Sequence, residues 1–186
     1  LLIFTVDGCD VQYLIALDKT TGKTAWKSDR NVDLQGFPYG RRKGYGTPTV
    51  YRAGGRLEMI TTAALCLFAH DPQSGEELWK LRIRGNCAVP RPIYYDGLLY
   101  VVMDHQFPEL WAITPGGSGE LDEDDVVWGV QKSAPRTPSF LLVDGKVLCI
   151  NDDGIAMCID SKSGEVVWRE AGLGRHMMTY TPRYHL

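Results

Sequence analysis

The sequence lacks long apolar runs, sustained helical periodicity and an excess of positive charge. No stretch approaches the length of a membrane-spanning segment, and no segment keeps a helical period beyond a turn or two. The chain carries 20 Lys and Arg against 23 Asp and Glu, for a formal net charge of −3 at pH 7. This balance gives no general attraction for nucleic acid or for an acidic membrane surface. We therefore expect neither a nucleic-acid partner nor a membrane span.

The cysteines form no recognisable site motif. No two cysteines are adjacent, and no CxxC or His-paired metal spacing occurs among the five present, Cys9, Cys66, Cys87, Cys149 and Cys158. We expect most of them to be buried free thiols, with a disulfide between Cys149 and Cys158 open as an alternative because their predicted strands are neighbours. The sequence also has no Ser/His/Asp or glycine-rich phosphate signature. It therefore predicts no catalytic residue and no metal ligand.

The sequence does contain one motif that is repeated at residues 16–26, 69–79 and 158–168. Each copy has a small residue, any residue, Asp, three residues, Gly, three residues and Trp. The Asp side chain can accept hydrogen bonds from the backbone a few residues on, and Gly supplies the positive φ that closes a turn. The tryptophan is an apolar plate whose N–H we expect to find a backbone carbonyl. The predicted structural residues are Asp18, Gly22, Trp26, Asp71, Gly75, Trp79, Trp128, Asp160, Gly164 and Trp168.

Because each unit has a tryptophan in the same register, we expect these rings to pack in the core rather than to stack on a cofactor. The third unit departs from this motif. It has residues 112–119 and an acidic insertion, 120–125, in its place, although Trp128 keeps the period. We expect a longer loop there. Its clustered carboxylates could hold calcium, but they lack EF-hand spacing, so we favour a solvated acidic loop.

A second series sets the size of the unit. Pro48, Pro92, Pro138 and Pro182 lie 44, 46 and 44 residues apart, and each opens an apolar run. Pro at the start of a strand costs no ladder hydrogen bond, and Asp-Gly pairs at 96–97 and 144–145 predict hairpins. Four short antiparallel strands, a to d, every 40–50 residues or so are typical of a β-propeller blade.

The predicted fold is therefore an all-β propeller of four-stranded antiparallel blades in a single domain, 1–186. About three blades are full and two are partial, at approximately 1–28 (strands b–d), 46–82, 89–130, 137–169 and 180–186 (strand a). Because the chain begins and stops within predicted strands, we expect a fragment of a seven- or eight-bladed propeller. The alternative is a closed four-bladed ring in which 180–186 completes the first blade, since closure removes exposed strand edges.

The pattern Ala-x-Asp-x-x-Thr-Gly-x-x-x-Trp, intact at 16–26 and nearly so in the other two copies, resembles the tryptophan-docking motif of the pyrroloquinoline quinone (PQQ) repeat propellers. That superfamily holds quinoprotein alcohol dehydrogenases and also propellers that bind no quinone, among them the lipoprotein of the outer-membrane β-barrel assembly machine. The sequence at residues 13–18 and 88–92 is most similar to that of bacterial PQQ-binding-like repeat proteins. The resemblance implies a periplasmic or otherwise extracytoplasmic location.

The resemblance does not reach the quinone chemistry. The quinone enzymes use a disulfide between adjacent cysteines, a calcium held by Glu, Asn and Asp, and an Asp base, and no position of this sequence can be matched to them. We therefore predict no cofactor. PQQ and calcium belong only to an alternative in which the active-site blades lie outside this chain.

Propellers carry function on loops and in the central channel. The d-to-a and b-to-c connections are expected to share one end of the blades, the long-loop face, which collects the loops 29–46, 104–108, 152–154 and 172–179. The candidate ligand-binding residues are Arg41, Arg42, Tyr45, Arg91, Asp104, His105, Arg136 and His176.

Each candidate has a plainer interpretation. Arg91, Arg136 and Arg183 recur before strand a and could bind a carboxylate or phosphate, but we favour pairing with acidic neighbours that holds the blades together. The basic triplet 41–43, flanked by tyrosines, could contact nucleic acid or glycan, yet a solvated loop is favoured. Asp104 beside His105 is a possible acid/base pair without a nucleophile.

The expected function is a non-catalytic binding scaffold whose ligand is a protein, a peptide or a polysaccharide on the long-loop face. The alternative is a PQQ- and calcium-dependent alcohol or sugar dehydrogenase. A third possibility is a sensor module attached to another domain. We also expect further blades or domains in the full-length protein.

Overall fold

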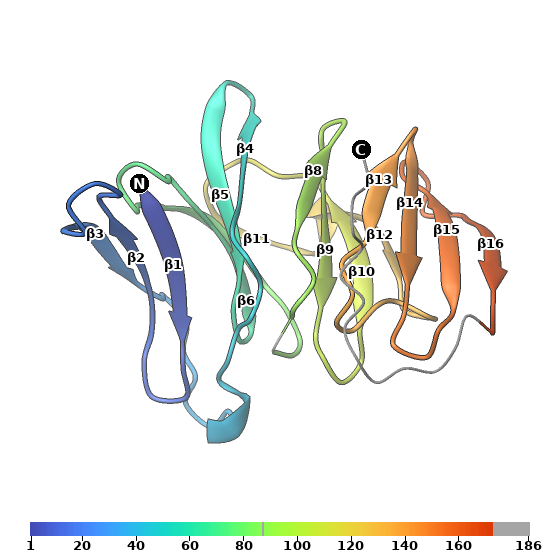
Figure 1. Ribbon diagram of the computed structural model, residues 1–186, viewed down its shortest axis with the longest axis horizontal. Helices are drawn as coiled ribbons and strands as arrows, with labels where there is room; N and C mark the ends of the chain where they lie inside the picture. Colours follow the sequence, from blue (N-terminus) through green and yellow to red (C-terminus); the bar gives the residue numbers. More distant parts are fainter. Residues whose placement is uncertain (87, 173–186) are drawn as a thin grey trace.

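The computed structural model describes residues 1–86 and 88–172 and consists of four β-sheets that stand side by side in chain order (Figure 1). Each sheet is one blade. The strands are, in blade 1, β1 (Leu2–Asp7), β2 (Gln12–Leu17) and β3 (Thr24–Asp29); in blade 2, β4 (Thr49–Ala53), β5 (Arg56–Thr62), β6 (Cys66–His70) and β7 (Glu77–Arg82); in blade 3, β8 (Ile93–Tyr95), β9 (Leu98–Met103), β10 (Glu109–Ile113) and β12 (Val126–Val130); and in blade 4, β13 (Leu141–Val143), β14 (Lys146–Ile150), β15 (Ala156–Asp160) and β16 (Val166–Glu170).

The all-β class and the propeller blades predicted from the repeat are confirmed. Within each blade, each of the strands named above pairs antiparallel with the next one, so these strands form a meander. The hairpins at 96–97 and 144–145 have positive φ at both central residues, 47° and 84° in the first and 48° and 71° in the second, as a type I′ turn requires. The predicted strand at 180–186, Arg183 and His176 lie outside the described residues.

The repeated motif forms the turn between the last two strands of a blade. In the first copy, Asp18 Oδ1 accepts hydrogen bonds from the backbone N–H groups of Thr20, at 2.9 Å, and Thr21, at 2.7 Å. Gly22 takes a φ of 70° and donates its N–H to the Asp18 carbonyl. The copies that begin at Asp71 and Asp160 repeat these bonds.

The glycine of this turn also seats the tryptophan of the preceding blade. A Cβ atom placed on Gly75 would lie 2.5 Å from the Trp26 ring, and one on Gly164 would lie 2.7 Å from the Trp128 ring. Only a residue without a side chain leaves room for that ring. Trp128 Nε1 donates to the Ser161 carbonyl at 2.9 Å, so blade 3 is tied to the turn of blade 4.

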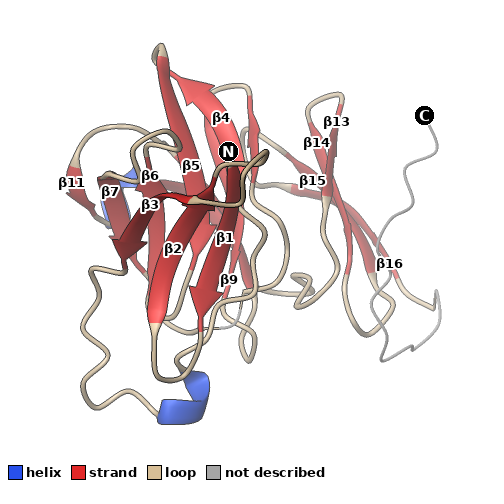
Figure 2. Ribbon diagram, turned by 60° about the vertical axis from the view of Figure 1, so that its left-hand side comes forward, coloured by secondary structure: helices blue, strands red, loops and turns tan. Residues whose placement is uncertain are grey.

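The irregular third unit differs from the predicted loop. Residues Gly119–Leu121 form a short strand, β11, which leaves blade 3 and pairs in parallel with β7 of blade 2 (Figure 2). A 3-10 turn at Glu123–Asp125 then leads into β12. The blade 2 sheet therefore has five strands, in the order β11-β7-β6-β5-β4. The expectation of a loop is wrong for this segment, because a partner 40 residues away in the sequence supplies its hydrogen bonds.

Trp79, whose docking turn would be the replaced one, uses a side chain instead of a backbone carbonyl. It is 0% exposed, and its Nε1 donates to Glu58 Oε2 at 2.8 Å. The same oxygen accepts the Tyr51 hydroxyl, and Arg56 donates to Glu58 Oε1 at 2.7 Å and to the Gly117 carbonyl at 2.9 Å. A buried carboxylate thus replaces the missing turn, which corrects the prediction of a backbone partner.

Trp168 is a second correction. The repeat places this ring in the core, but its exposed fraction is 46%. The tryptophans of blades 1 and 3 are seated by a turn of the following blade, and no such turn follows blade 4 within the described residues. The same motif position is therefore buried at Trp79 and exposed at Trp168.

Different kinds of contact join the blades. Apolar clusters fill the spaces between blades 2 and 3 and between blades 3 and 4. Between blades 1 and 2 the apolar cluster is small, and a buried ion pair lies beside it. There Arg30 donates through Nε to Asp7 Oδ1 at 3.0 Å and through its terminal nitrogen to Oδ2 at 2.8 Å, with both side chains 0% exposed. A further bond from Arg30 reaches the Thr61 hydroxyl in blade 2.

Cys149 and Cys158 are free and buried, so the alternative of a disulfide between them is not met. The strand register gives the reason. Cys149 faces Met157 and Cys158 faces Leu148. Because successive side chains of a strand point to opposite faces, the two sulfur atoms lie on opposite sides of the blade 4 sheet. Burial also raises the pKa of the Cys149 thiol to about 12, which keeps it protonated.

Candidate functional site

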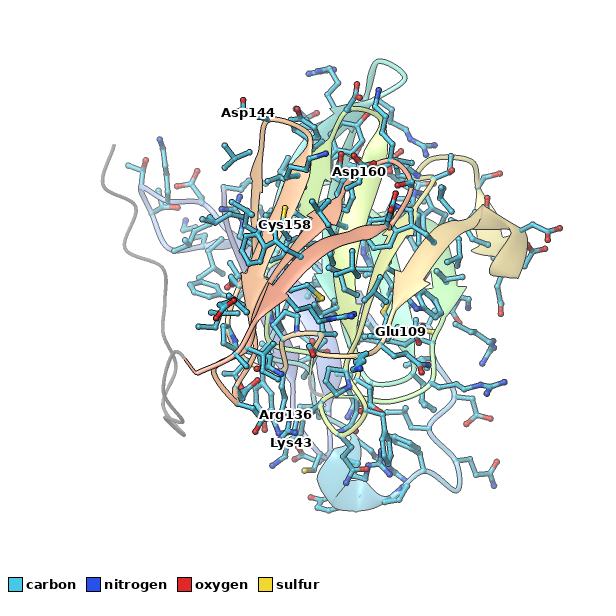
Figure 3. All side chains as sticks on the ribbon, turned by 90° about the vertical axis from the view of Figure 1, so that its right-hand side faces the viewer. Lys43, Glu109, Arg136, Asp144, Cys158 and Asp160 are labelled. Atoms are coloured by element: carbon cyan, nitrogen blue, oxygen red, sulfur yellow. The ribbon has the colours of Figure 1, made fainter. Side chains whose placement is uncertain are left out.

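The d-to-a and b-to-c connections meet at one end of the blades, which is the predicted long-loop face. The loop between β3 and β4, residues 30–48, contacts both kinds of connection: Arg41 Nε donates to Asn86 Oδ1 at 3.2 Å, and a Cβ on Gly44 would lie 2.6 Å from the Thr62 carbonyl. Figure 3 shows Lys43 and Arg136 at this end of the molecule and Asp144 at the opposite end. The structure therefore brings most of the predicted candidates to one face.

Two members of the basic triplet, Arg41 and Arg42, contact Phe37 of their own loop. Arg41 lies over the Phe37 ring, with its guanidinium carbon 5.4 Å from the ring centroid, and Arg42 Nε donates to the Phe37 carbonyl at 2.9 Å. Both arginines are half-buried, whereas Tyr45 is exposed. Arg41 and Arg42 thus order the long loop, and Tyr45 is the member of this group with a free ring.

Asp104 does not pair with the imidazole of His105. It is buried and adopts a φ of 59°, and its Oδ1 accepts the backbone N–H groups of His105 at 2.6 Å and of Gln106 at 3.1 Å. The His105 Nδ1 atom is buried without a hydrogen-bond partner in the part of the chain that the structure describes. The carboxylate therefore shapes the loop after β9, and the acid/base pair considered from the sequence is not formed.

The two recurring arginines differ from the favoured prediction of acidic partners. Arg91 Nε donates to the Thr49 hydroxyl at 3.1 Å, and its backbone N–H reaches Ser139 at 3.3 Å. At Arg136 the backbone N–H, rather than the guanidinium, donates to Asp152 at 2.9 Å. Arg91 links the first strands of blades 2 and 3 through a hydroxyl, and the Arg136 side chain is exposed.

A cleft of about 610 Å³ lies between blades 2 and 3, and the sequence did not predict it. Its walls are β7 and β11 on one side and β10 and β12 on the other, and the loops after β7 and β9 line its end at the long-loop face. The lining residues are Leu81, Arg82, Arg84, Met103, Asp104, Phe107, Glu109, Trp111, Glu120, Leu121, Asp122, Val126 and Gln131. Figure 3 shows Glu109 nearer to the end that carries Arg136 than to the end that carries Asp144. The acidic insertion 120–125 and the loop 104–108 were the sequence signals that fall on this cleft.

The cleft combines apolar walls with carboxylates. Arg82 and Glu120, on the paired strands β7 and β11, form a salt bridge along its edge. Glu109 Oε2 accepts a hydrogen bond from the Gln131 amide at 3.2 Å, and Asp122 Oδ1 accepts the backbone N–H of Asp124 at 2.9 Å. Phe107 is 80% exposed. An open, partly aromatic and acidic cleft of this size can hold a side chain or a short segment of another molecule.

No group of three or more His, Cys, Asp and Glu is placed to hold a metal ion in residues 1–86 and 88–172. The carboxylates of Asp122 and Asp125 in the acidic insertion accept backbone N–H groups of that insertion. Among the described residues there is also no helix that is long and apolar enough to cross a membrane.

Comparison with known proteins places this architecture in a family. A family model described as outer membrane protein assembly factor BamB matches residues 10–175. A search of the curated proteins finds no match. The crystal structure of BamB from Moraxella catarrhalis superposes with a TM-score of 0.59 at 14% identity, covering 85% of this chain and 46% of that chain.

Quinoprotein enzymes share the fold as well. The quinohemoprotein alcohol dehydrogenase ADHIIG from Pseudomonas putida HK5 gives a TM-score of 0.51 at 22% identity, covering 69% of this chain and 20% of that chain. A europium-containing methanol dehydrogenase gives 0.52 at 17% identity, covering 69% of this chain and 25% of that one. This chain thus spans less than half the length of these structures, and the likeness is one of fold. Since the family model covers most of the sequence, the chain belongs to the BamB-like family of PQQ-type propeller repeat proteins.

Proposed function

We propose that this chain is a non-catalytic binding scaffold that holds a protein, peptide or polysaccharide ligand on its long-loop face and in the adjoining cleft between blades 2 and 3. The cleft is the observation that carries the proposal. Its volume of about 610 Å³ is in the range of ligand-binding sites, about 300–1,000 Å³. Asp104 and Phe107 belong both to the cleft and to the loop after β9, so one ligand can contact the cleft and that face together.

Family membership supports a protein partner and an extracytoplasmic location, because the matching model is described as an outer membrane assembly factor. We also propose further blades in the full-length protein. The exposed ring of Trp168 supports them, since the corresponding rings of Trp26 and Trp128 are seated by the next blade. Fractionation of cells that express the full-length protein tests the location, and recovery in the cytoplasm would contradict it.

Site-specific photo-crosslinking in the native host tests the binding role. A photoreactive amino acid at Phe107 or Tyr45, which are exposed on the proposed surface, should give an adduct of defined mass. The control is Tyr95, an exposed residue at the a-to-b hairpin of blade 3. Adducts of equal yield at all three positions, or none at Phe107 and Tyr45, would contradict a ligand on this face.

The dehydrogenase alternative stays a prediction and has a direct test of its own. The full-length protein is incubated with PQQ and calcium, and dye-linked oxidation of alcohols and sugars is followed together with the quinone absorbance. Bound quinone with turnover would overturn the non-catalytic role.

A further inference from the structure

We propose that the cleft between blades 2 and 3 takes an extended peptide segment that carries both apolar and basic side chains. This ligand class rests on the binding role proposed above and makes it specific. Three properties of the cleft carry the inference: an apolar wall, three carboxylates without a cationic partner among the described residues, and an edge strand at its rim.

The apolar wall comes from both blades. Leu121 of β11 and Trp111 of β10 line the cleft and are only half-buried, as is Val126 at the start of β12. Phe107 lies at the end of the cleft nearest the long-loop face, with 80% of its surface exposed. A large aromatic side chain that stays this exposed beside an open cleft is typical of an interaction site. Apolar side chains of a ligand would cover these surfaces.

The charges select the ligand. The Arg82 guanidinium is paired with Glu120. Asp104, Glu109 and Asp122 line the same cleft, and none of them has a cationic partner within ion-pair distance among the described residues. Among the described residues that line the cleft, Arg84 is the one cation outside the Arg82–Glu120 pair. The unpaired charge is therefore mainly negative, and the faces of Trp111 and Phe107 also attract cations. Lysine or arginine side chains of a ligand complement this surface.

The edge strand favours a polypeptide over a sugar. β11 pairs with β7 on one side and is the outermost strand of its five-stranded sheet. Its free edge therefore presents backbone N–H and C=O groups that an extended chain can pair with. Glu120 and Leu121 of this strand both line the cleft. A peptide along the edge can therefore place alternate side chains against the carboxylates and the apolar wall.

Calorimetric titration of the full chain with three probes tests the inference. The first is a capped ten-residue peptide with leucine and lysine in a glycine-serine background, the second has glutamate in place of lysine, and the third is maltoheptaose. We expect measurable binding of the lysine peptide alone. It should also change the tryptophan fluorescence, and W111F should remove that change.

A charge variant and a matched control locate the site. The double variant Glu109→Gln, Asp122→Asn keeps the hydrogen-bond acceptors but removes two charges, and we expect the dissociation constant of the lysine peptide to rise about tenfold. The control Asp144→Asn, Glu170→Gln removes two exposed charges outside the cleft and should leave the constant within about twofold. Circular dichroism melting confirms that both variants fold.

Several outcomes would overturn the inference. These are equal binding of the glutamate peptide, equal weakening by the control variant, binding of maltoheptaose in place of the peptide, and no binding of the lysine peptide. Each of them leaves the scaffold role standing if Phe107 still gives a crosslinked adduct in cells. Loss of that adduct refutes the scaffold role itself, so the two failures are distinguishable.

Discussion

Single residues of this propeller do different work at equivalent positions of the repeat, because their neighbours differ. Trp79 and Trp168 occupy the same position in the repeated motif. Trp79 is fully buried against Glu58, whereas Trp168 is nearly half exposed. The sequence alone predicts one role for both. Replacing each tryptophan should therefore change the free energy of unfolding by a different amount.

We expect Trp79→Ala to lower the free energy of unfolding by about 3–5 kcal/mol, because it leaves a cavity and removes a hydrogen bond to a buried carboxylate. Trp168→Ala should cost less than about 1.5 kcal/mol, since only part of that ring leaves water. Urea denaturation of both variants measures the difference. Equal losses would show that the repeat position, rather than burial, sets the contribution.

The ion pair of Asp7 and Arg30 offers a second comparison. Asp7→Asn leaves Arg30 buried without a charged partner and should destabilise by about 3 kcal/mol or more. Asp29 forms an exposed pair with Lys27, so Asp29→Asn should change the free energy of unfolding by no more than about 0.5 kcal/mol. Thermal or urea unfolding of the two variants checks this, and a small effect at Asp7 would argue against a dry contact between blades 1 and 2.

His70 gives the fold a pH dependence. Burial, with a smaller contribution from the nearby Arg30 charge, lowers the pKa of His70 from 6.5 to about 3, so the ring stays neutral in the folded state. Below pH 6.5 the unfolded chain binds a proton here that the folded chain does not. The contribution of the neutral ring is therefore complete above that pH and is lost as the pH falls toward 3, by up to about 1.4 kcal/mol per pH unit.

His70→Phe should accordingly flatten the fall in stability between about pH 6.5 and pH 5, a window above the titration of ordinary carboxyl groups. The chain with His70 unchanged is the reference for this comparison. Urea unfolding at several pH values measures both slopes, and an unchanged slope in the His70 variant would refute a neutral buried ring.

At the scale of elements, the docking turn is both a link between strands and a seat for the preceding blade. Gly22 and Gly75 separate these roles. Both have positive φ, 70° and 78°, but a Cβ on Gly22 would meet nothing within 4 Å, whereas one on Gly75 would lie 2.5 Å from the Trp26 ring. One position reports the cost of the turn alone, and the other adds the cost of the contact between blades.

Gly22→Ala should therefore destabilise by about 1–2 kcal/mol, the cost of a left-handed conformation. Gly75→Ala should lose a further 1–3 kcal/mol or so, because the Trp26 ring must move. Urea unfolding of both variants, with Trp26 fluorescence as a local probe, measures the difference. Identical losses at the two glycines would mean that Trp26 does not depend on its seat.

Sequence reasoning succeeded with local elements and failed with contacts between distant ones. Strands, hairpins and docking turns follow from residues a few positions apart, such as Asp18 and Gly22. The pairing of β11 with β7 and the carboxylate of Glu58 under Trp79 depend on residues far apart in the chain, which no local pattern reveals. The cleft was missed for the same reason, because its walls come from two blades.

At the scale of the whole molecule, apolar surface is exposed on both outermost sheets. Leu2 and Phe4 are exposed on β1, and Val143, Val167 and Trp168 are exposed on blade 4. β1 also pairs with β2 alone among the described strands, and an open edge with apolar side chains favours association.

We therefore expect this chain to self-associate as its concentration rises. The double variant Phe4→Lys, Val167→Lys should shift it toward the monomer, because it places charges on both outer sheets. Val50→Lys with Val127→Lys is the matched control, since these valines are equally exposed on the inner blades 2 and 3. Sedimentation velocity over a concentration series distinguishes the variants, and a monomer throughout would contradict the expectation.

The crossing of β11 into blade 2 also sets an order of events during synthesis. Four strands of blade 2 leave the ribosome first, but the fifth lies beyond β8, β9 and β10 of the next blade. During synthesis the N-terminal part of a chain emerges, and becomes able to pair, before the C-terminal part. The edge of β7 therefore stays unpaired until residues 119–121 have emerged, and the nascent chain completes blade 2 only after most of blade 3 exists. The fifth strand of blade 2, which forms a wall of the cleft, is therefore translated after three strands of blade 3.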